Sequence, residues 1–216
     1  MPFPSSGSFQ SPRLSFSTAV FFNSGVSAYS AVLSIGAASG DRVVVIGVGA
    51  YSNGNALSVS GVTVGGVSAA SVVQAETGNS ALAAIFALGV PAGTSTAIVA
   101  TMNVAASQGA FAIYTLLGMN GVATFARSNS TGGVQTLTTT VQAPPNGSVL
   151  GVSFFATNAL TSTITWTGPT LDSTISTAAG TISVAHMNFA NRAQAVQAAC
   201  STTLFSGRSS LVVASF

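Results

Sequence analysis

The chain has 216 residues, of which 48% are hydrophobic and only 4% are charged, and its formal net charge is +2. This composition excludes intrinsic disorder, because chains that stay unfolded combine low hydrophobicity with high net charge. It also argues against nucleic-acid binding through phosphate contacts, because the five arginines lie singly along a chain without lysine and form no basic patch.

The first segment, residues 1–26, is rich in proline and phenylalanine and lacks a basic region followed by an apolar run, so we expect no cleaved secretory signal. Two interpretations of this segment remain open. It could be a first edge strand with a frayed tail. Alternatively, it is an arm that lies across a neighbouring subunit, with apolar anchors at Phe3, Phe9, Phe16, Phe21 and Phe22.

Short apolar segments separated by Gly, Asn, Ser or Pro clusters follow along the whole chain. This spacing predicts an all-β fold, an antiparallel β-sandwich of immunoglobulin-like or jelly-roll type. Only residues 191–199, which are rich in alanine, compete as a short helix. The candidate strands are 14–22, 28–35, 42–51, 57–64, 81–90, 96–104, 110–117, 136–142, 148–157, 163–167, 181–189, 198–205 and 209–216.

A weak internal repeat organises these strands. A shift of 107 residues lays Gly40 on Gly147, Val45 on Val152 and Leu57 on Ile164. The repeat predicts two pseudo-repeat units, residues 27–118 and 134–216, joined by a turn-rich linker at 119–133. Each unit could be its own sandwich, or the two units could face each other as one jelly-roll-like sandwich.

The inventory of reactive side chains is small, with three acids, one histidine and one cysteine. We interpret Asp41 and Asp172 as turn residues, His186 as a strand residue, and Cys200 as inert because no basic residue is close to it in sequence. The run VVVIGVGAYSNG resembles a dinucleotide motif, but no helix pattern follows it to bind a phosphate. We therefore predict no enzymatic activity, no catalytic or metal-binding residue and no cofactor.

The small number of charged residues instead indicates that the chain works as part of a larger protein assembly. Edge strands of soluble sandwiches are commonly protected from aggregation by lysine, other charges or proline, and this chain has few such residues. Low net charge also removes the repulsion that keeps small domains apart. We expect partners to cover the edges and apolar faces, although a monomer kept soluble by its many Ser, Thr, Asn and Gln side chains is the simpler alternative.

The segments GDRVVVIGVGA, SGVTVGGVSAASVVQ, ALAAIFALGVPAGTSTAIVATM and GAFAIYTLLG, within residues 39–118, resemble virion structural proteins of tailed bacteriophages. The resemblance implies a protein that decorates or cements the capsid, or a head-fibre or tail component. It implies other virion proteins as partners, the major capsid protein first, and a homo-oligomer, with a trimer favoured. It also implies a location in the virion, assembled in the host cytoplasm, without nucleic-acid or membrane binding.

Two further classes stay open. A receptor-binding or carbohydrate-binding module would use exposed aromatic side chains, for which Trp166, Tyr51 and Tyr114 are the candidates. An outer-membrane barrel is suggested only by the terminal SLVVASF, and the dense glycine turns without long polar loops argue against it.

Overall fold

The computed structural model describes residues 13–23, 25–78, 81–118, 124–132, 134–156, 163–177, 180–189 and 192–216, without the side chains of 204–206. Phe3 and Phe9, two of the predicted anchors, lie outside the described residues. No helix that could cross a membrane is present in the described part of the chain.

Within these residues the secondary structure consists of strands, so the predicted all-β class is confirmed. The strands of the first half are β1 (Arg13–Phe22), β2 (Val26–Ser34), β3 (Val43–Tyr51), β4 (Val59–Val64), β5 (Val67–Ser68), β6 (Ala70–Thr77), β7 (Ala81–Gly89), β8 (Ser95–Ala106) and β9 (Gln108–Leu117). Those of the second half are β10 (Thr124–Ser130), β11 (Val134–Ala143), β12 (Ser148–Ala156), β13 (Ile164–Thr167), β14 (Thr170–Thr177), β15 (Gly180–Asn188), β16 (Gln194–Ser206) and β17 (Arg208–Ser215).

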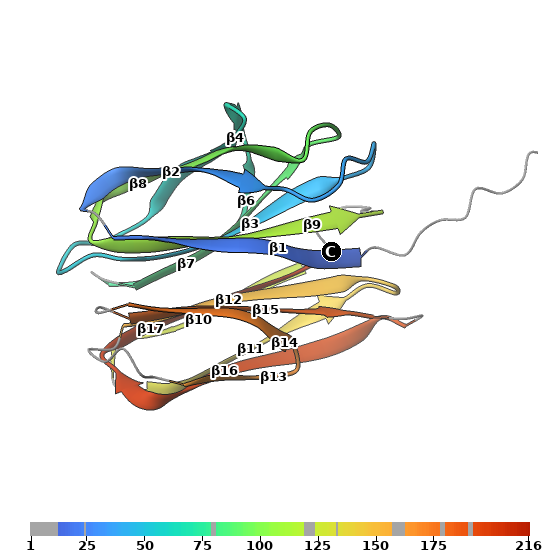
Figure 1. Ribbon diagram of the computed structural model, residues 1–216. Coiled ribbons are helices and arrows are strands. Elements are labelled where there is room, and N and C mark those ends of the chain that lie inside the picture. Colours follow the sequence, from blue (N-terminus) through green and yellow to red (C-terminus); the bar gives the residue numbers. More distant parts are fainter. Residues whose placement is uncertain are drawn as a thin grey trace, which may run out of the picture.

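These strands form four antiparallel sheets that stack as four layers (Figure 1). The first inner sheet has the order β1-β9-β3-β7-β6, and the first outer sheet has the order β2-β8-β4-β5. The second inner sheet, β10-β17-β12-β15-β14, and the second outer sheet, β11-β16-β13, follow the same strand order. Each half is therefore a sandwich of its own, and the two halves are not the two sheets of one sandwich.

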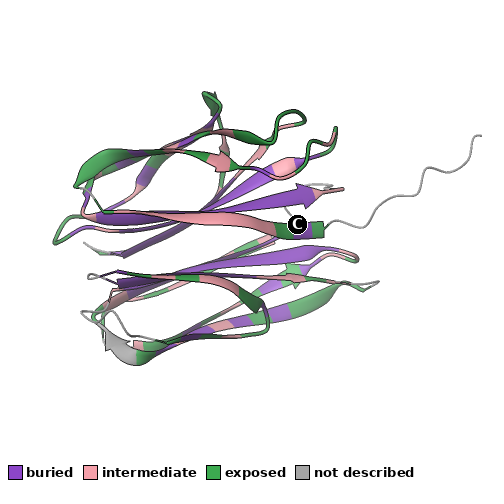
Figure 2. Ribbon diagram, viewed as in Figure 1, coloured by how far each residue is buried: buried purple, intermediate pink, exposed green. Residues whose placement is uncertain are grey.

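The inner and outer sheets differ in their sequence patterns. Central inner strands such as β3, β9 and β12 are buried along almost their whole length, and they read as continuous apolar runs. Outer strands such as β8 and β11 alternate between buried and exposed residues. The inner strands have continuous apolar sequences because both faces of each inner sheet are buried, as Figure 2 shows for the two middle layers.

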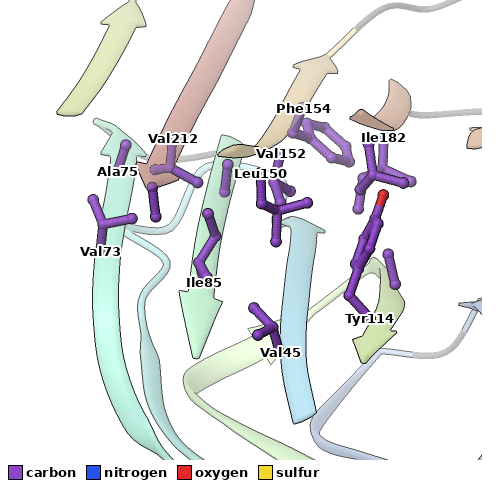
Figure 3. Close-up of a cluster of buried hydrophobic side chains, with 14 of the residues drawn as sticks. Val45, Val73, Ala75, Ile85, Tyr114, Leu150, Val152, Phe154, Ile182 and Val212 are labelled. Carbon is purple, nitrogen blue, oxygen red and sulfur yellow. The ribbon is translucent and has the colours of Figure 1, made fainter. Parts of the chain in front are cut away.

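Three apolar clusters fill the three spaces between the four layers. The middle cluster joins the two halves and includes Val45 and Ile85 from the first inner sheet and Val152, Phe154 and Val212 from the second (Figure 3). The other two clusters each lie between the inner and outer sheet of one half. The interior of each half thus remains separate, while the middle cluster belongs to both.

The packing between the inner sheets is reciprocal. β6 contacts β10 and β17, β1 contacts β14 and β15, and β3 contacts β12 at the centre. β1 and β10 occupy matching places in their sheets, as do β6 and β14. The two halves therefore meet in an approximately two-fold arrangement, like the like-with-like interface of a symmetric dimer.

Several sequence expectations differ from the structure, among them the turn expected at Asp172, which lies in the strand β14. β10 lies inside residues 119–133, which were predicted to be only a linker, and it forms an edge of the second inner sheet. The alternative helix at 191–199 is wrong where the structure describes it, because β16 begins at Gln194 and places Val196, Ala198 and Cys200 in the core. Because alternate residues of a strand point to the same side, these three residues lie on one face of the sheet.

Candidate interaction surfaces

The described phenylalanines of the N-terminal segment lie in β1, an edge strand of the first inner sheet. The ring of Phe16 meets that of Tyr114 edge-on with centroids 5.4 Å apart, and the ring of Phe22 lies 4.9 Å from that of Phe111. Phe21 packs against the middle cluster. All three side chains are half-buried within their own chain, so their described contacts are with the chain's own core.

One cluster of polar side chains joins the two inner sheets beside Phe16. The Tyr114 hydroxyl on β9 donates a hydrogen bond of 2.6 Å to Oδ2 of Asp172 on β14. Nδ1 of His186 on β15 lies 2.8 Å from both carboxylate oxygens of Asp172. Burial, aided by the neighbouring carboxylate, raises the pKa of Tyr114 above its usual range, so the phenol stays protonated and keeps donating.

The reactive groups of this cluster are few. It contains one carboxylate and one imidazole, and its phenol is too weakly acidic to act as a nucleophile at neutral pH. No three His, Cys, Asp or Glu side chains come together as a metal site among the residues that the structure describes. What the arrangement can do is fix the relative position of the two halves through buried hydrogen bonds.

Side chains of the second half also cap the open edges of the first inner sheet. The Asn188 amide accepts from the Leu14 N–H at 2.9 Å and donates to the Leu14 carbonyl at 3.0 Å, as a neighbouring strand would. At the opposite edge, Arg127 donates to the carbonyl of Gln74 at 3.0 Å, and Asn129 donates to that of Glu76 at 2.9 Å. These bonds protect the sheet edges without lysine.

Arg42 is a buried structural residue. Its side chain is 1% exposed, and its guanidinium donates to the carbonyls of Gly36, Ala37, Val90 and Ala92 at 2.6–2.9 Å. These carbonyls belong to the β2–β3 and β7–β8 connections. Arg42 therefore joins two loops and is withdrawn from any surface.

The three aromatic residues that a carbohydrate module would need are used inside the molecule. The indole N–H of Trp166 donates to Ser183 Oγ at 2.5 Å, and the ring of Tyr51 stacks on that of Phe154 with centroids 6.2 Å apart. Tyr114 is bound to Asp172. Tyr114 is buried, and Tyr51 and Trp166 are half-buried.

Cys200 is buried in the second half, with its sulfur 3.1 Å from Ser153 Oγ. Burial raises the pKa of this thiol to about 12, so its thiolate is not available near neutral pH. The thiol therefore behaves as a small core side chain, which agrees with the interpretation from sequence.

The outer sheets carry no charged residue in any of their strands, β2, β4, β5, β8, β11, β13 and β16. The first outer sheet exposes apolar side chains, with Val32 73% and Val67 60% exposed. The outward face of the second is mainly threonine and glutamine, at Thr136, Thr138, Thr140, Gln142, Thr165, Thr167 and Gln197. These two faces lie at opposite ends of the four-layer stack (Figure 1).

Neither a scan against protein-family models nor a search of curated proteins finds a match to this chain.

Proposed function

We propose that the protein is a structural subunit of an assembled particle, and that its two charge-free outer faces bind neighbouring subunits. The observation that carries this proposal is the absence of Asp, Glu, Lys, Arg and His from every outer-sheet strand. The centres of protein interfaces are depleted of charged residues in the same way. An outer β-face that stays in water usually carries charges that keep the protein soluble.

The placement of the faces favours a bridging role. Because they lie at opposite ends of the stack, one molecule can contact a neighbour on each side. The exposed valines of the first outer sheet lie among serine and threonine side chains, and they suit a firm contact because burying them contributes favourable free energy. The threonine-rich face suits a contact held by many hydrogen bonds.

The resemblance of residues 39–118 to tailed-phage virion proteins supports a phage particle as the setting of this assembly. In that setting the protein is a capsid decoration or cement protein that binds the major capsid protein and sister copies. A tail or fibre position is the alternative. Side chains of the second half already bond to Leu14 on β1 and to Gln74 and Glu76 on β6, so the proposal rests on the outer faces and not on these edges.

Lysine substitutions at exposed positions of each face, on the strands β2 and β11, test the proposal. We expect Val32→Lys and Thr138→Lys each to weaken self-association or particle binding by about tenfold or more, because an unpaired charge would be buried in the contact. Asn53→Lys, at an exposed loop position, is the matched control and should bind like the parent chain. Sedimentation velocity and co-sedimentation with purified particles measure the effect.

Fractionation of phage particles provides the second readout. The proposal expects the chain in purified virions. A chain found only free in the lysate, or face variants that associate like the parent, would contradict it.

A further inference from the structure

A groove lies where the edge strands of the two inner sheets meet, between β6 and β10. It has a volume of about 410 Å³, which falls within the size range of small-ligand sites. Its polar and aromatic lining comes from Ser71, Gln74 and Glu76 of β6 and from Phe125 and Arg127 of β10. The groove is thus built by both halves and depends on their packing.

Phe125 supplies an open aromatic surface. Its side chain is 60% exposed, whereas the rings of Phe16 and Phe22 on β1 pack against other rings of the chain. Phe125 stands opposite Ala214 in the β10–β17 register, so no large cross-strand neighbour covers it. A flat apolar ring left in water beside a groove is a common platform for a ligand.

Two of the few charged side chains of this protein line the same groove without pairing to each other. Arg127 donates to the Gln74 carbonyl, and no ion pair joins it to Glu76 among the described residues. The Glu76 side chain is exposed and has no hydrogen bond there. One acceptor group and one donor group of opposite charge therefore remain available beside an aromatic ring.

We propose that this groove binds a neutral carbohydrate. The C–H face of a sugar ring would lie against Phe125, while its hydroxyl groups would donate to Glu76 and accept from Arg127. A charged ligand would be attracted by one of these two groups and repelled by the other, so net charge brings no gain, whereas a neutral polyhydroxyl ligand can hydrogen-bond to both. This inference goes beyond the structural role, because it gives an assembled particle a means of attaching to glycans, where many copies act together.

The test uses the full chain on an array of neutral and acidic glycans, followed by titration calorimetry with the neutral glycan that binds best. We expect saturable binding that Phe125→Ala weakens by about tenfold or more and that Phe125→Trp retains. Glu76→Gln should weaken binding less, because an amide still accepts a hydrogen bond. Leu171→Ala removes an exposed apolar side chain from β14, at the opposite edge of the second inner sheet, and is the matched control.

Phe125→Leu keeps an apolar side chain without the ring, and thermal melting of each variant checks that it folds. Loss of binding in Phe125→Ala and Phe125→Leu, with unchanged melting, supports the ring contact. The proposal is overturned by an array without any Phe125-dependent neutral-glycan signal, by binding restricted to acidic glycans, or by equal loss in Leu171→Ala.

Discussion

At the scale of single residues, the clearest case is Arg42. A buried arginine normally needs a carboxylate, because the desolvation of its charge is costly. Here four backbone carbonyls solvate the guanidinium, and its planar fork of donors reaches two loops at once. The sequence suggested only the start of a strand, because the meeting of the β2–β3 and β7–β8 loops is a tertiary feature.

Arg42→Met should lower the free energy of unfolding by about 3–5 kcal/mol, because it leaves buried carbonyls without donors. Arg42→Lys should recover only part of this loss, since a single ammonium cannot reach the same set of carbonyls. Urea denaturation measures both variants. The exposed Arg13→Met is the control, and a loss in Arg42→Met no larger than in this control would contradict the structural role.

At the scale of elements, the sequence predicted the central strands well but missed four of the eight edge strands, including the two-residue β5. Continuous runs such as VVVIGVGAY and GAFAIYTLL identified β3 and β9, because burial on both faces leaves no polar alternation. β6, β10 and β14 were missed. These are edge strands with mixed sequences such as TFARSNS and TLDSTIST, half-covered by neighbours that only the folded chain brings close.

The close approach of the inner sheets depends on glycine in β3. A Cβ at Gly47 would lie 2.8 Å from Val152, and one at Gly49 would collide with Ile182 of the second half. The motif Gly47-x-Gly49, which resembled a nucleotide-binding sequence, therefore has a packing role. Its glycines make room for side chains of the opposite sheet.

Gly49→Ala should lower the free energy of unfolding by about 1–3 kcal/mol, because the added methyl group overpacks the middle cluster. Gly89→Ala on the paired strand β7 adds the same methyl group in open space and should be neutral or slightly stabilising. Thermal and urea unfolding compare the two. Equal effects would show that propensity, and not the contact between sheets, governs this position.

At the scale of the whole molecule, the sequence predicted two like units but not how they meet. The inner faces use mainly Ala and Val together with Leu, Ile and Phe, and in sequence these look the same as the residues of any strand core. The uncharged composition of the outer faces was visible in the chain, whereas the groove at Phe125 and the Tyr114–Asp172–His186 cluster were not. Both join residues of the two halves that lie at least 49 positions apart in sequence.

Because the middle cluster belongs to both halves, we expect the molecule to unfold as one cooperative unit. Separation would expose one face of each inner sheet, including Val45 and Val152, to water. Scanning calorimetry should therefore show a single transition whose calorimetric and van't Hoff enthalpies agree. Ile98→Ala in the core of the first half and Val196→Ala in that of the second should both shift that one transition downward. Independent halves would instead give two transitions, each responding to only one of the two substitutions.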